Sequence, residues 1–386
     1  MIPYARQEID DADVEAVVAV LRSDFLTQGP AVPRFERAVA DACGAAHGVA
    51  VNSATSALHV ACLALGLGPG DWLWTSPITF VASANCALYC GARVDFVDID
   101  PRSHCLSVER LAAKLASAER DGRLPKIVVP VHFAGQPADM AGIHALARRY
   151  GFRVIEDASH ALGARYRGEP VGCGRYSDVA VFSFHPVKII TSGEGGICVT
   201  NDGALAERMR RLRSHGITRD ANEMTHAPDG PWYYQQLELG YNYRLTDLQA
   251  ALGASQLTRL PSFLERRRRV ARQYDDALRG LPVVTPWTGP DVESALHLYV
   301  IRLEPGPGRR SHRQVYEALR ADGVGVNLHY IPVYRQPFYA RAGYAPDDYP
   351  EAERFYGQAI SLPMFPGLTA AQQAHVVDAV RRAYPS

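Results

Sequence analysis

The order of strand and helix patterns along the chain predicts an α/β fold built on a largely parallel sheet that helices cover on both faces. Seven short apolar runs lie in the first 200 residues of the 386-residue chain, and helical patterns separate most of them. Hydrophobic residues make up 47% of the sequence, which supports a sizeable core. After about residue 245 longer helices and two strands follow, which predicts a small second domain of α+β type.

The predicted elements of the first part alternate in type. A helix over 11–21 has apolar residues at helical spacing and acids in its first turn, and a second helix is predicted over 32–43. The predicted strands are 49–52, 72–75, 93–97, 127–132, 153–155, 179–184 and 197–200. The helices predicted among them are 55–65, 81–90, 108–120, 140–150 and 204–215.

The second part of the chain is predicted to hold a smaller set of elements. Its helices are expected at 246–257, 262–278, 313–322, 349–360 and 369–384, and its strands at 296–303 and 324–329. We place the domain boundary near Pro261. Residues 1–260 then form the N-terminal segment and the large α/β domain, and residues 261–386 form the small α+β domain.

Composition excludes several classes of protein. The 41 basic and 41 acidic residues give a formal net charge of zero, which argues against a general binder of nucleic acid or membrane surfaces. The run of four arginines at 266–269 lies in a helical pattern and is interpreted as a solvated helix face. Seven cysteines without ligand spacing indicate reduced thiols and no metal site. With no signal peptide and no membrane-spanning run, a cytoplasmic protein is expected.

A lone lysine lies in a short, glycine-rich connection between two predicted buried strands. Lys188 belongs to the stretch SFHPVKIITSGEGG, residues 183–196. An amine that loses water at such a place has a lowered pKa and can act as a nucleophile. The chemistry that uses such an amine is Schiff-base formation, above all with pyridoxal phosphate. The alternative interpretation, an ordinary loop lysine, is weakened by the motifs around it.

An acid ends the predicted strand upstream of this connection. The segment VIEDASHA, residues 154–161, is a short apolar strand that ends in Glu156 and Asp157, followed by small polar residues. Pyridoxal enzymes need a carboxylate against the pyridinium nitrogen, because the protonated ring is the electron sink. Asp157 and Lys188 therefore supply the two ends of a predicted cofactor site.

Small hydroxyl residues lie where the first predicted strand gives way to a helix. In the run from Ser53 through Ala54 and Thr55 to Ser56, backbone amides are left free to meet an anion, which the helix dipole favours. A plain helix cap is the alternative interpretation. With Lys188 present, a phosphate cradle is favoured. No GxGxxG, GxxxxGK[ST], GxSxG or HExxH motif offers a rival chemistry.

Taken together, the motifs resemble the DegT/DnrJ/EryC1/StrS sugar aminotransferases, a family of pyridoxal-phosphate enzymes of fold type I. The resemblance rests on NSATSAL at 52–58, EDASHA at 156–161, SFH at 183–185 with Lys188, GEGG at 193–196, RSHG at 213–216, GYNYR at 240–244 and HYIPVY at 329–334. These motifs cover nearly the whole chain in order. Within the family the sequence is most similar to the C4 aminotransferases of pseudaminic acid synthesis, the UDP-4-amino-4,6-dideoxy-N-acetyl-β-L-altrosamine transaminases.

The resemblance implies a seven-stranded, mostly parallel sheet in the large domain, a catalytic Lys188 and a set of cofactor-binding residues. That set is Ala54, Thr55, Phe80, Asp157, His160, Ser183, Lys188 and Asn242. It places Phe80 against the cofactor ring and His160 near it, where core residues would be the plainer interpretation of both. It also places Asn242 on the cofactor phosphate of the other subunit, which implies a homodimer with shared active sites.

The resemblance further implies a nucleotide-sugar site. The substrate-binding residues that it implies are Tyr4, Asp24, Phe25, Leu26, Thr27, Asn327, Leu328, His329 and Tyr330. From composition alone, the 24–27 loop is a connector between two helices. The implied reaction aminates C4 of a UDP-linked 4-keto-6-deoxy-N-acetylhexosamine, with glutamate as the amino donor.

Two alternatives stay open at this point. The same scaffold serves other nucleotide-linked keto sugars, including dTDP- and GDP-sugars, and a branch that removes a sugar hydroxyl carries His where this chain has Lys188. The chain could also be a non-catalytic sugar-binding relative. The presence of both Lys188 and Asp157 argues against that second alternative.

Overall fold

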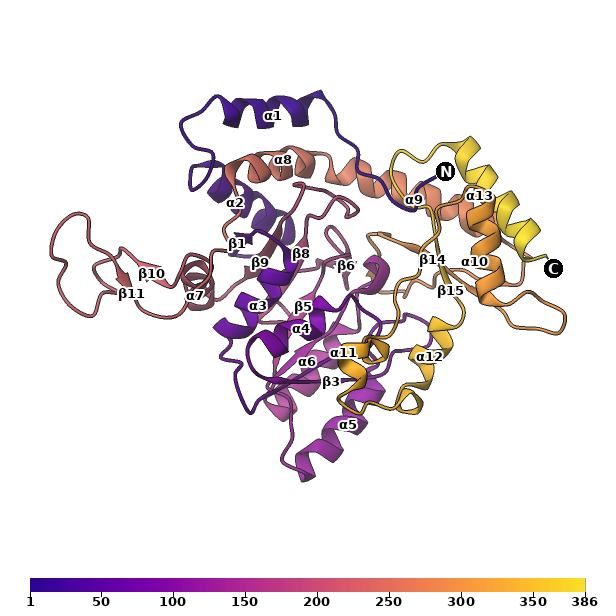
Figure 1. The fold of residues 1–386 in the computed structure, drawn as a ribbon, viewed down its shortest axis with the longest axis horizontal. Helices are drawn as coiled ribbons and strands as arrows, with labels where there is room; N and C mark the ends of the chain where they lie inside the picture. Colours follow the sequence, from indigo (N-terminus) through magenta and orange to yellow (C-terminus); the bar gives the residue numbers. More distant parts are fainter. Residues whose placement is uncertain (386) are drawn as a thin grey trace.

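A seven-stranded sheet forms the centre of the computed structural model, which describes residues 1–385 (Figure 1). Its strand order is β1-β9-β8-β5-β4-β2-β3. The strands are β1 (His47–Val51), β2 (Trp72–Thr75), β3 (Arg93–Phe96), β4 (Ile127–Val129), β5 (Arg153–Asp157), β8 (Val179–Ser183) and β9 (Gly196–Thr200). Only β9 runs antiparallel to its neighbours, so the predicted mostly parallel α/β sheet is confirmed.

Helices follow the strands and cover the sheet. In the first part of the chain these are α1 (Asp11–Leu21), α2 (Ala31–Cys43), α3 (Ala54–Ala64), α4 (Ala82–Tyr89), α5 (Val108–Arg120), α6 (Met140–Tyr150), α7 (Gly203–Arg213) and α8 (Asp247–Thr258). Along β1, β8 and β9, successive side chains enter two different buried clusters. One contains residues of α3 and α7, and the other residues of α2 and α8. This period of two is expected for a strand that is buried on both faces.

The C-terminal part packs a small antiparallel sheet against helices. Its strands are β12 (Val283–Val284), β14 (Tyr299–Leu303) and β15 (Ala359–Leu362). Its helices are α9 (Leu260–Ala277), α10 (His312–Ala321), α11 (Pro337–Ala340), α12 (Pro350–Tyr356) and α13 (Ala370–Ala383). A third buried cluster joins this sheet to α9, α10 and α13. The division of the chain after residue 260 stays a prediction, and it falls at the start of α9.

Two small sheets of short strands lie outside the central sheet and the C-terminal sheet. Strands β6 (Arg165–Tyr166), β7 (Glu169–Pro170) and β13 (Val292–Glu293) form one small sheet. A two-stranded ribbon of β10 (Ile217–Thr218) and β11 (Gln235–Gln236) projects from the body beyond α7 (Figure 1). Its loop exposes Trp232 and Tyr234. Three single 3₁₀ turns lie at Phe133–Gly135, Val333–Arg335 and Pro346–Asp348.

Several predicted elements differ from the structure in their bounds or their type. Strand β4 ends at Val129, because Pro130 has no N–H to continue the ladder. The predicted strand over 324–329 forms only isolated bridges, from Val324 to Ile2 and from Asn327 to Ser361 of β15. The helix predicted over 349–360 ends at Tyr356, and the residues after it become β15, which pairs with β14. The pairing partners of the 324–329 segment and of β15 lie far away in the sequence, so local patterns did not predict these two outcomes.

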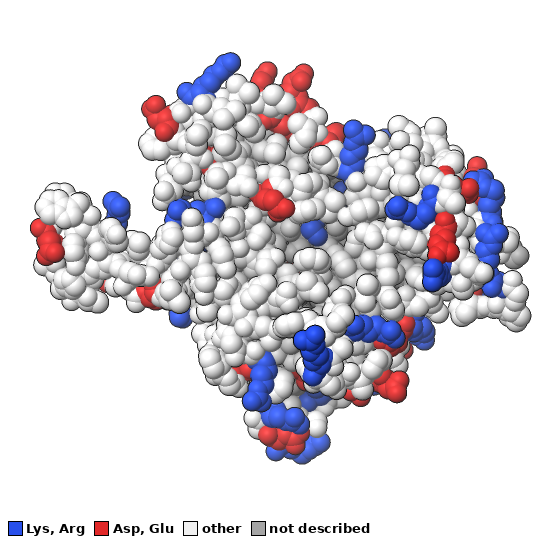
Figure 2. Space-filling model, in the orientation of Figure 1, with Lys and Arg blue, Asp and Glu red and all other residues white. Residues whose placement is uncertain are grey.

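The surface carries charges of both signs. On the face drawn in Figure 2, basic and acidic side chains are interspersed toward the margins, and the central part is largely uncharged. Within residues 1–385, no helix combines the length and the apolar character needed to cross a bilayer.

Candidate active site

A cavity of about 550 Å³ lies at the carboxyl ends of the parallel strands. It receives Asp157 from the end of β5, Ser183 from the end of β8 and the first residues of α3, which follows β1. Ligands bind at this edge in open α/β sheets, because the connections that follow the strands diverge there. The sheet topology therefore explains why polar residues that are far apart in the sequence meet in one cavity.

The connection between β8 and β9 holds Lys188 at this cavity. The backbone N–H of Lys188 donates to the carbonyl of His185 at 2.9 Å. The Thr191 hydroxyl donates to the carbonyl of Phe184 at 2.9 Å, and Phe184 and Ile190 are buried. The connection is thus tied down on both sides of the lysine. Desolvation by the surrounding protein lowers the pKa of Lys188 to about 8, although the nearby Asp157 carboxylate opposes the shift.

Lys188 is one of only three lysines in the chain. The other two are held in ion pairs away from the cavity, Lys114 with Asp95 at 2.7 Å and Lys126 with Asp71 at 2.8 Å. The remaining 38 of the 41 basic residues are arginines, which cannot supply a neutral amine. This scarcity was a signal in the sequence for the single lysine that lines the active-site cavity.

Asp157 is held as a buried, oriented carboxylate. It is 5% exposed, and its Oδ2 accepts a hydrogen bond of 2.6 Å from the Ser83 hydroxyl. Its Oδ1 accepts from the backbone N–H of Ser159 at 3.1 Å. The Ser83 hydroxyl lies 2.8 Å from that of Thr79, which extends the network. Sequence patterns did not single out Ser83, because its role depends on a contact across 74 residues.

The N-terminus of α3 forms a concave anion-binding site. Ser53 caps the helix by accepting from the N–H of Ser56 at 3.2 Å, and Ala54 and Thr55 line the cavity. A Cβ atom placed on Gly196 would lie 2.4 Å from the backbone nitrogen of Ala54, so glycine is needed for β9 to approach this turn. Free amides, the helix dipole and the Ser183 hydroxyl at the rim suit a phosphate group.

Neutral aromatic groups line another part of the cavity. Burial lowers the pKa of His160 and of His297 well below the ordinary value, and their rings lie 4.4 Å apart. His160 Nε2 lies 3.1 Å from the hydroxyl of Tyr330, whose pKa is raised by burial. Nδ1 of His160 has no partner within residues 1–385. His297 and Glu194 also line the cavity, although the sequence had not pointed to either as a site residue.

The segment 327–330 closes the cavity together with the N-terminus of the chain. Asn327, Leu328, His329 and Tyr330 line it with Tyr4, whose ring lies 5.4 Å from that of His329. His329 Nδ1 lies 2.8 Å from the Ser361 hydroxyl, which fixes the imidazole, and burial lowers its pKa to about 3. Phe80 lies on the same cavity and is largely exposed to it.

Five of the residues that the resemblance implied do not line this cavity. Asn242 is exposed at the base of the β10–β11 ribbon, where it bridges Ser214. Residues 24–27 form an exposed loop after α1, in which Phe25 is 52% and Leu26 48% exposed. The cavity of a single chain therefore brings together all the other implied residues, and these five lie outside it.

The comparisons with known proteins agree with this geometry. The model of the DegT/DnrJ/EryC1/StrS aminotransferase family matches residues 7–381. The chain belongs to this aminotransferase family. The spore coat polysaccharide biosynthesis protein SpsC of Bacillus subtilis is 37% identical over 383 residues, which are 98% of this chain and 96% of SpsC.

Solved structures of this family superpose over nearly the full length. Helicobacter pylori PseC, an aminotransferase of pseudaminic acid biosynthesis, has a TM-score of 0.88 at 30% identity and covers 99% of both chains. The putative sugar aminotransferase Spr1654 of Streptococcus pneumoniae, in its PLP form, has a TM-score of 0.87 at 26% identity and covers 99% of this chain and 98% of its own. The protein is thus a sugar aminotransferase with the fold of type I enzymes, and its cofactor is pyridoxal phosphate.

The cavity of this aminotransferase fits that cofactor. The α3 turn and Ser183 suit the phosphate, the buried Asp157 carboxylate suits a protonated ring nitrogen, and Lys188 is the one amine available. The unpartnered Nδ1 of the buried His160 leaves a polar position open for a bound group.

Lys188 is expected to titrate at a lower pH than an ordinary lysine. In the cofactor-free protein, the neutral fraction of its amine should rise about tenfold per pH unit up to about pH 8 and then level off, because only the neutral amine reacts. Acetylation by trace acetic anhydride, followed by peptide mass spectrometry with Lys126 as internal reference, measures this profile. A midpoint near the ordinary lysine value of about 10.4 would contradict the desolvated environment.

Proposed function

We propose that the protein transfers an amino group to C4 of a UDP-linked 4-keto-6-deoxy-N-acetylhexosamine in pseudaminic-acid-type nucleotide-sugar synthesis, with glutamate as donor. The assignment of amino transfer rests on one observation, which is that Lys188 and Asp157 lie in one cavity beside the α3 turn. The full-length likeness to PseC supports the sugar assignment. The lysine and carboxylate together argue against a non-catalytic sugar-binding role.

The cofactor supplies an aldehyde that accepts an amino group and a ring that draws electrons from the reacting carbon. Lys188 Nζ would take a proton from that carbon and give one to the carbon on the other side of the transferred nitrogen, which its pKa of about 8 permits near neutral pH. Asp157 holds a proton on the ring nitrogen through its carboxylate. Ser83 and the N–H of Ser159 keep that carboxylate in place.

The other cavity residues are assigned to binding. The α3 turn with Ser183 binds the phosphate, and Phe80 with His160 packs at the ring. Tyr4 and the segment 327–330 bind the keto sugar, with His329 held neutral by burial. With these rings neutral, Lys188 and Asp157 divide the work: the amine exchanges a proton at the reacting carbon, and the carboxylate serves the ring nitrogen.

The likeness to SpsC favours a different sugar substrate. SpsC is named for spore coat polysaccharide biosynthesis, and it is 37% identical to this chain, whereas PseC is 30% identical. Another nucleotide-linked keto sugar is therefore the competing assignment. Turnover with a panel of UDP-, dTDP- and GDP-linked 4-keto sugars, with glutamate as donor and mass spectrometry of the products, tests the proposal. Activity confined to a dTDP- or GDP-sugar would overturn the UDP assignment and leave the aminotransferase assignment intact.

The residues outside the cavity are proposed to serve a partner's site in a homodimer. Asn242 and the 24–27 loop are exposed. The β10–β11 ribbon beside Asn242 projects from the body (Figure 1). Its loop carries exposed aromatic side chains. Exposed apolar groups such as Phe25 and Leu26 favour an interface. In this arrangement, Asn242 of one chain faces the phosphate bound at the α3 turn of the other.

Mixed dimers of Lys188→Ala and Asn242→Asp chains are expected to regain activity that neither parent has. One site then carries both defects and the other carries none. Half the dimers in a random mixture are mixed, and one of their two sites works, so about a quarter of wild-type turnover should return. Turnover after unfolding and refolding of the mixture, compared with each parent alone, measures this.

The matched control mixes Lys188→Ala with Asp157→Asn chains. Both residues line the cavity of their own chain, so every mixed dimer keeps one defect in each site and no activity should return. If mixed dimers form and the Asn242→Asp mixture also stays inactive, Asn242 serves its own chain and the shared-site proposal fails.

A further inference from the structure

Three cysteines gather where α3 packs against α4 (Figure 1). Cys62 lies on α3, Cys86 lies on α4, and Cys90 follows the last residue of α4. Cys86 and Cys90 are four residues apart, so they lie on one face of their helix. The Cys62 thiol forms hydrogen bonds with both of them. None of the three cysteines lines the active-site cavity, so the proposed amino transfer does not use them.

A histidine makes the environment of Cys90 different from that of the other two thiols. His59 lies one turn before Cys62 on α3, and its Nδ1 is 3.2 Å from the Tyr243 hydroxyl. Its Nε2 is buried and has no hydrogen-bond partner within residues 1–385. The hydrogen bond from Cys62 and the neighbouring His59 lower the pKa of Cys90, although desolvation opposes the shift. Hydrogen bonds to Cys86 and Cys90 raise the pKa of Cys62, so Cys90 carries the thiolate and Cys62 keeps its proton.

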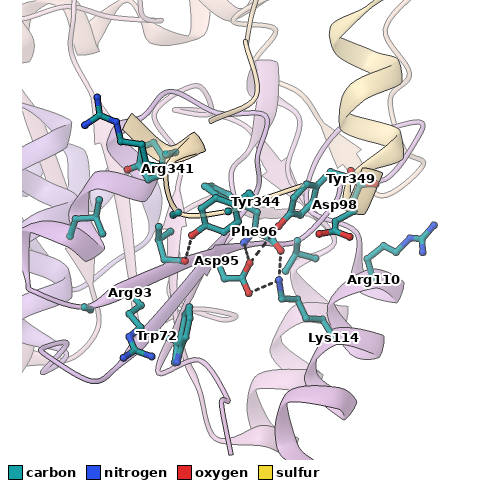
Figure 3. Close-up of a pocket in the computed structure, with 18 of the residues that line it drawn as sticks. Trp72, Arg93, Asp95, Phe96, Asp98, Arg110, Lys114, Arg341, Tyr344 and Tyr349 are labelled. Carbon is teal, nitrogen blue, oxygen red and sulfur yellow. Dashed lines mark hydrogen bonds and ion pairs between the residues drawn. The ribbon is translucent and has the colours of Figure 1, made fainter. Parts of the chain in front are cut away.

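Cys90 is also the member of the cluster that reaches solvent. It is 8% exposed, whereas Cys62 and Cys86 are fully buried. A hollow of about 920 Å³ lies beside the end of α4 and is bounded by β3, α5 and the segment 338–349 (Figure 3). The residues two before and two after Cys90 line this hollow, but no cysteine of the cluster does. A reagent must therefore be small and must reach Cys90 first.

The other four cysteines provide a comparison within the same chain. Cys43, Cys105 and Cys198 are at most 1% exposed, and burial raises the pKa of each. Cys173 is more exposed than Cys90, but desolvation raises its pKa too. Exposure alone therefore predicts that Cys173 reacts first. Thiolate character predicts that Cys90 reacts first, because the thiolate is the reactive form of cysteine.

We propose that Cys90 is a site of oxidation by hydrogen peroxide and that Cys62 resolves the product as a disulfide. The Cys90 thiolate attacks one peroxide oxygen, which forms an S–O bond and breaks the O–O bond. The released hydroxide takes up the proton that Cys90 had lost to solvent. The Cys62 sulfur then attacks the Cys90 sulfur, an S–S bond replaces the S–O bond, and the oxygen leaves as water with the Cys62 proton. The two cysteines lose two electrons, which reduce one peroxide to two molecules of water.

This disulfide joins two helices that build the active site. The first turn of α3 lines the cavity, and α4 carries Ser83, whose hydroxyl donates to Asp157 at 2.6 Å. The Cys86 thiol donates to the carbonyl of Ser83 at 3.3 Å. The oxidation chemistry is nevertheless independent of the proposed amino transfer, because no residue of the cavity takes part in it.

Brief exposure of the reduced holoenzyme to hydrogen peroxide, followed by alkylation of free thiols and peptide mass spectrometry, tests this proposal. A cross-linked peptide pair that contains Cys62 and Cys90 should form, and dithiothreitol should remove it. The free thiol of Cys90 should be lost at least about tenfold faster than that of Cys173, since the thiolate fraction changes about tenfold per unit of pKa. The matched control is Cys86→Ser, which keeps both reacting thiols and should still form the cross-link.

Two further variants separate the two steps. Cys62→Ser should leave a sulfenic acid on Cys90, where dimedone captures it, because the resolving thiol is gone. Cys90→Ser should form no disulfide and should leave the Cys62 thiol free. Oxidation of Cys173 ahead of Cys90 in the wild type, or a disulfide formed through Cys86, would overturn the proposal. Either outcome leaves the proposed aminotransferase function intact, since no active-site residue is changed.

Discussion

The Lys188→Ala variant is expected to lose at least about a hundredfold in transaminase turnover, because general acid–base groups contribute about 10²–10⁴ in rate. Lys188 is the one lysine that lines the cavity, and burial lowers its pKa to about 8. Nothing else within reach supplies a neutral amine, since the other basic residues are arginines and two ion-paired lysines. Alanine removes the amine without adding bulk, so the fold should survive.

Turnover and circular dichroism of Lys188→Ala together measure this effect. Lys126→Ala is the matched control, because its amine is paired with Asp71 at 2.8 Å on the surface. After borohydride reduction of the wild type, the mass of the cofactor should stay on the peptide that contains Lys188. Full activity in Lys188→Ala, or cofactor mass on another peptide, would refute the assignment of the catalytic lysine.

The Asp157→Asn variant is expected to retain pyridoxal phosphate and to lose well over tenfold in turnover. Asparagine keeps the shape of the side chain but removes the negative charge that holds a proton on the ring nitrogen. An unprotonated ring is a weaker electron sink, so proton removal from the donor slows. Binding should persist, because Lys188 and the α3 turn hold the other parts of the cofactor.

Cofactor content from absorbance and the turnover number with glutamate measure the two effects separately. Ser83→Ala provides a graded comparison, since it removes the 2.6 Å hydrogen bond to Asp157 and keeps the charge. It should reduce turnover less than Asp157→Asn does. If Asp157→Asn stays within about a factor of two of the wild type, far below the 1.4 kcal/mol that makes a tenfold change, the carboxylate has been misassigned.

Local patterns in the sequence determined most of the large domain. Helices predicted over 108–120 and 140–150 coincide with α5 and α6, because each has an apolar face of helical period and a side-chain cap at its start. The seven buried strands also lie where apolar runs were found. Lys188 and Asp157 could be identified for the same reason, since Asp157 ends β5 and Lys188 lies in the short connection after β8, and the patterns of both strands are visible within a few residues.

The other features of the fold and of the site depend on contacts between distant parts of the chain, so only the tertiary structure decided them. Pairing with β14 made a strand of Ala359–Leu362, whose first two residues were predicted as the end of a helix. The meeting of Tyr4 with residues 327–330, the hydrogen bond from Ser83 to Asp157 and the neutral His160 all arise from packing across 70 residues or more. The hollow beside β3 likewise joins α5 to a segment more than 200 residues later. Burial and pairing of this kind leave no periodic trace in a sequence, because they depend on which distant surfaces the fold brings together.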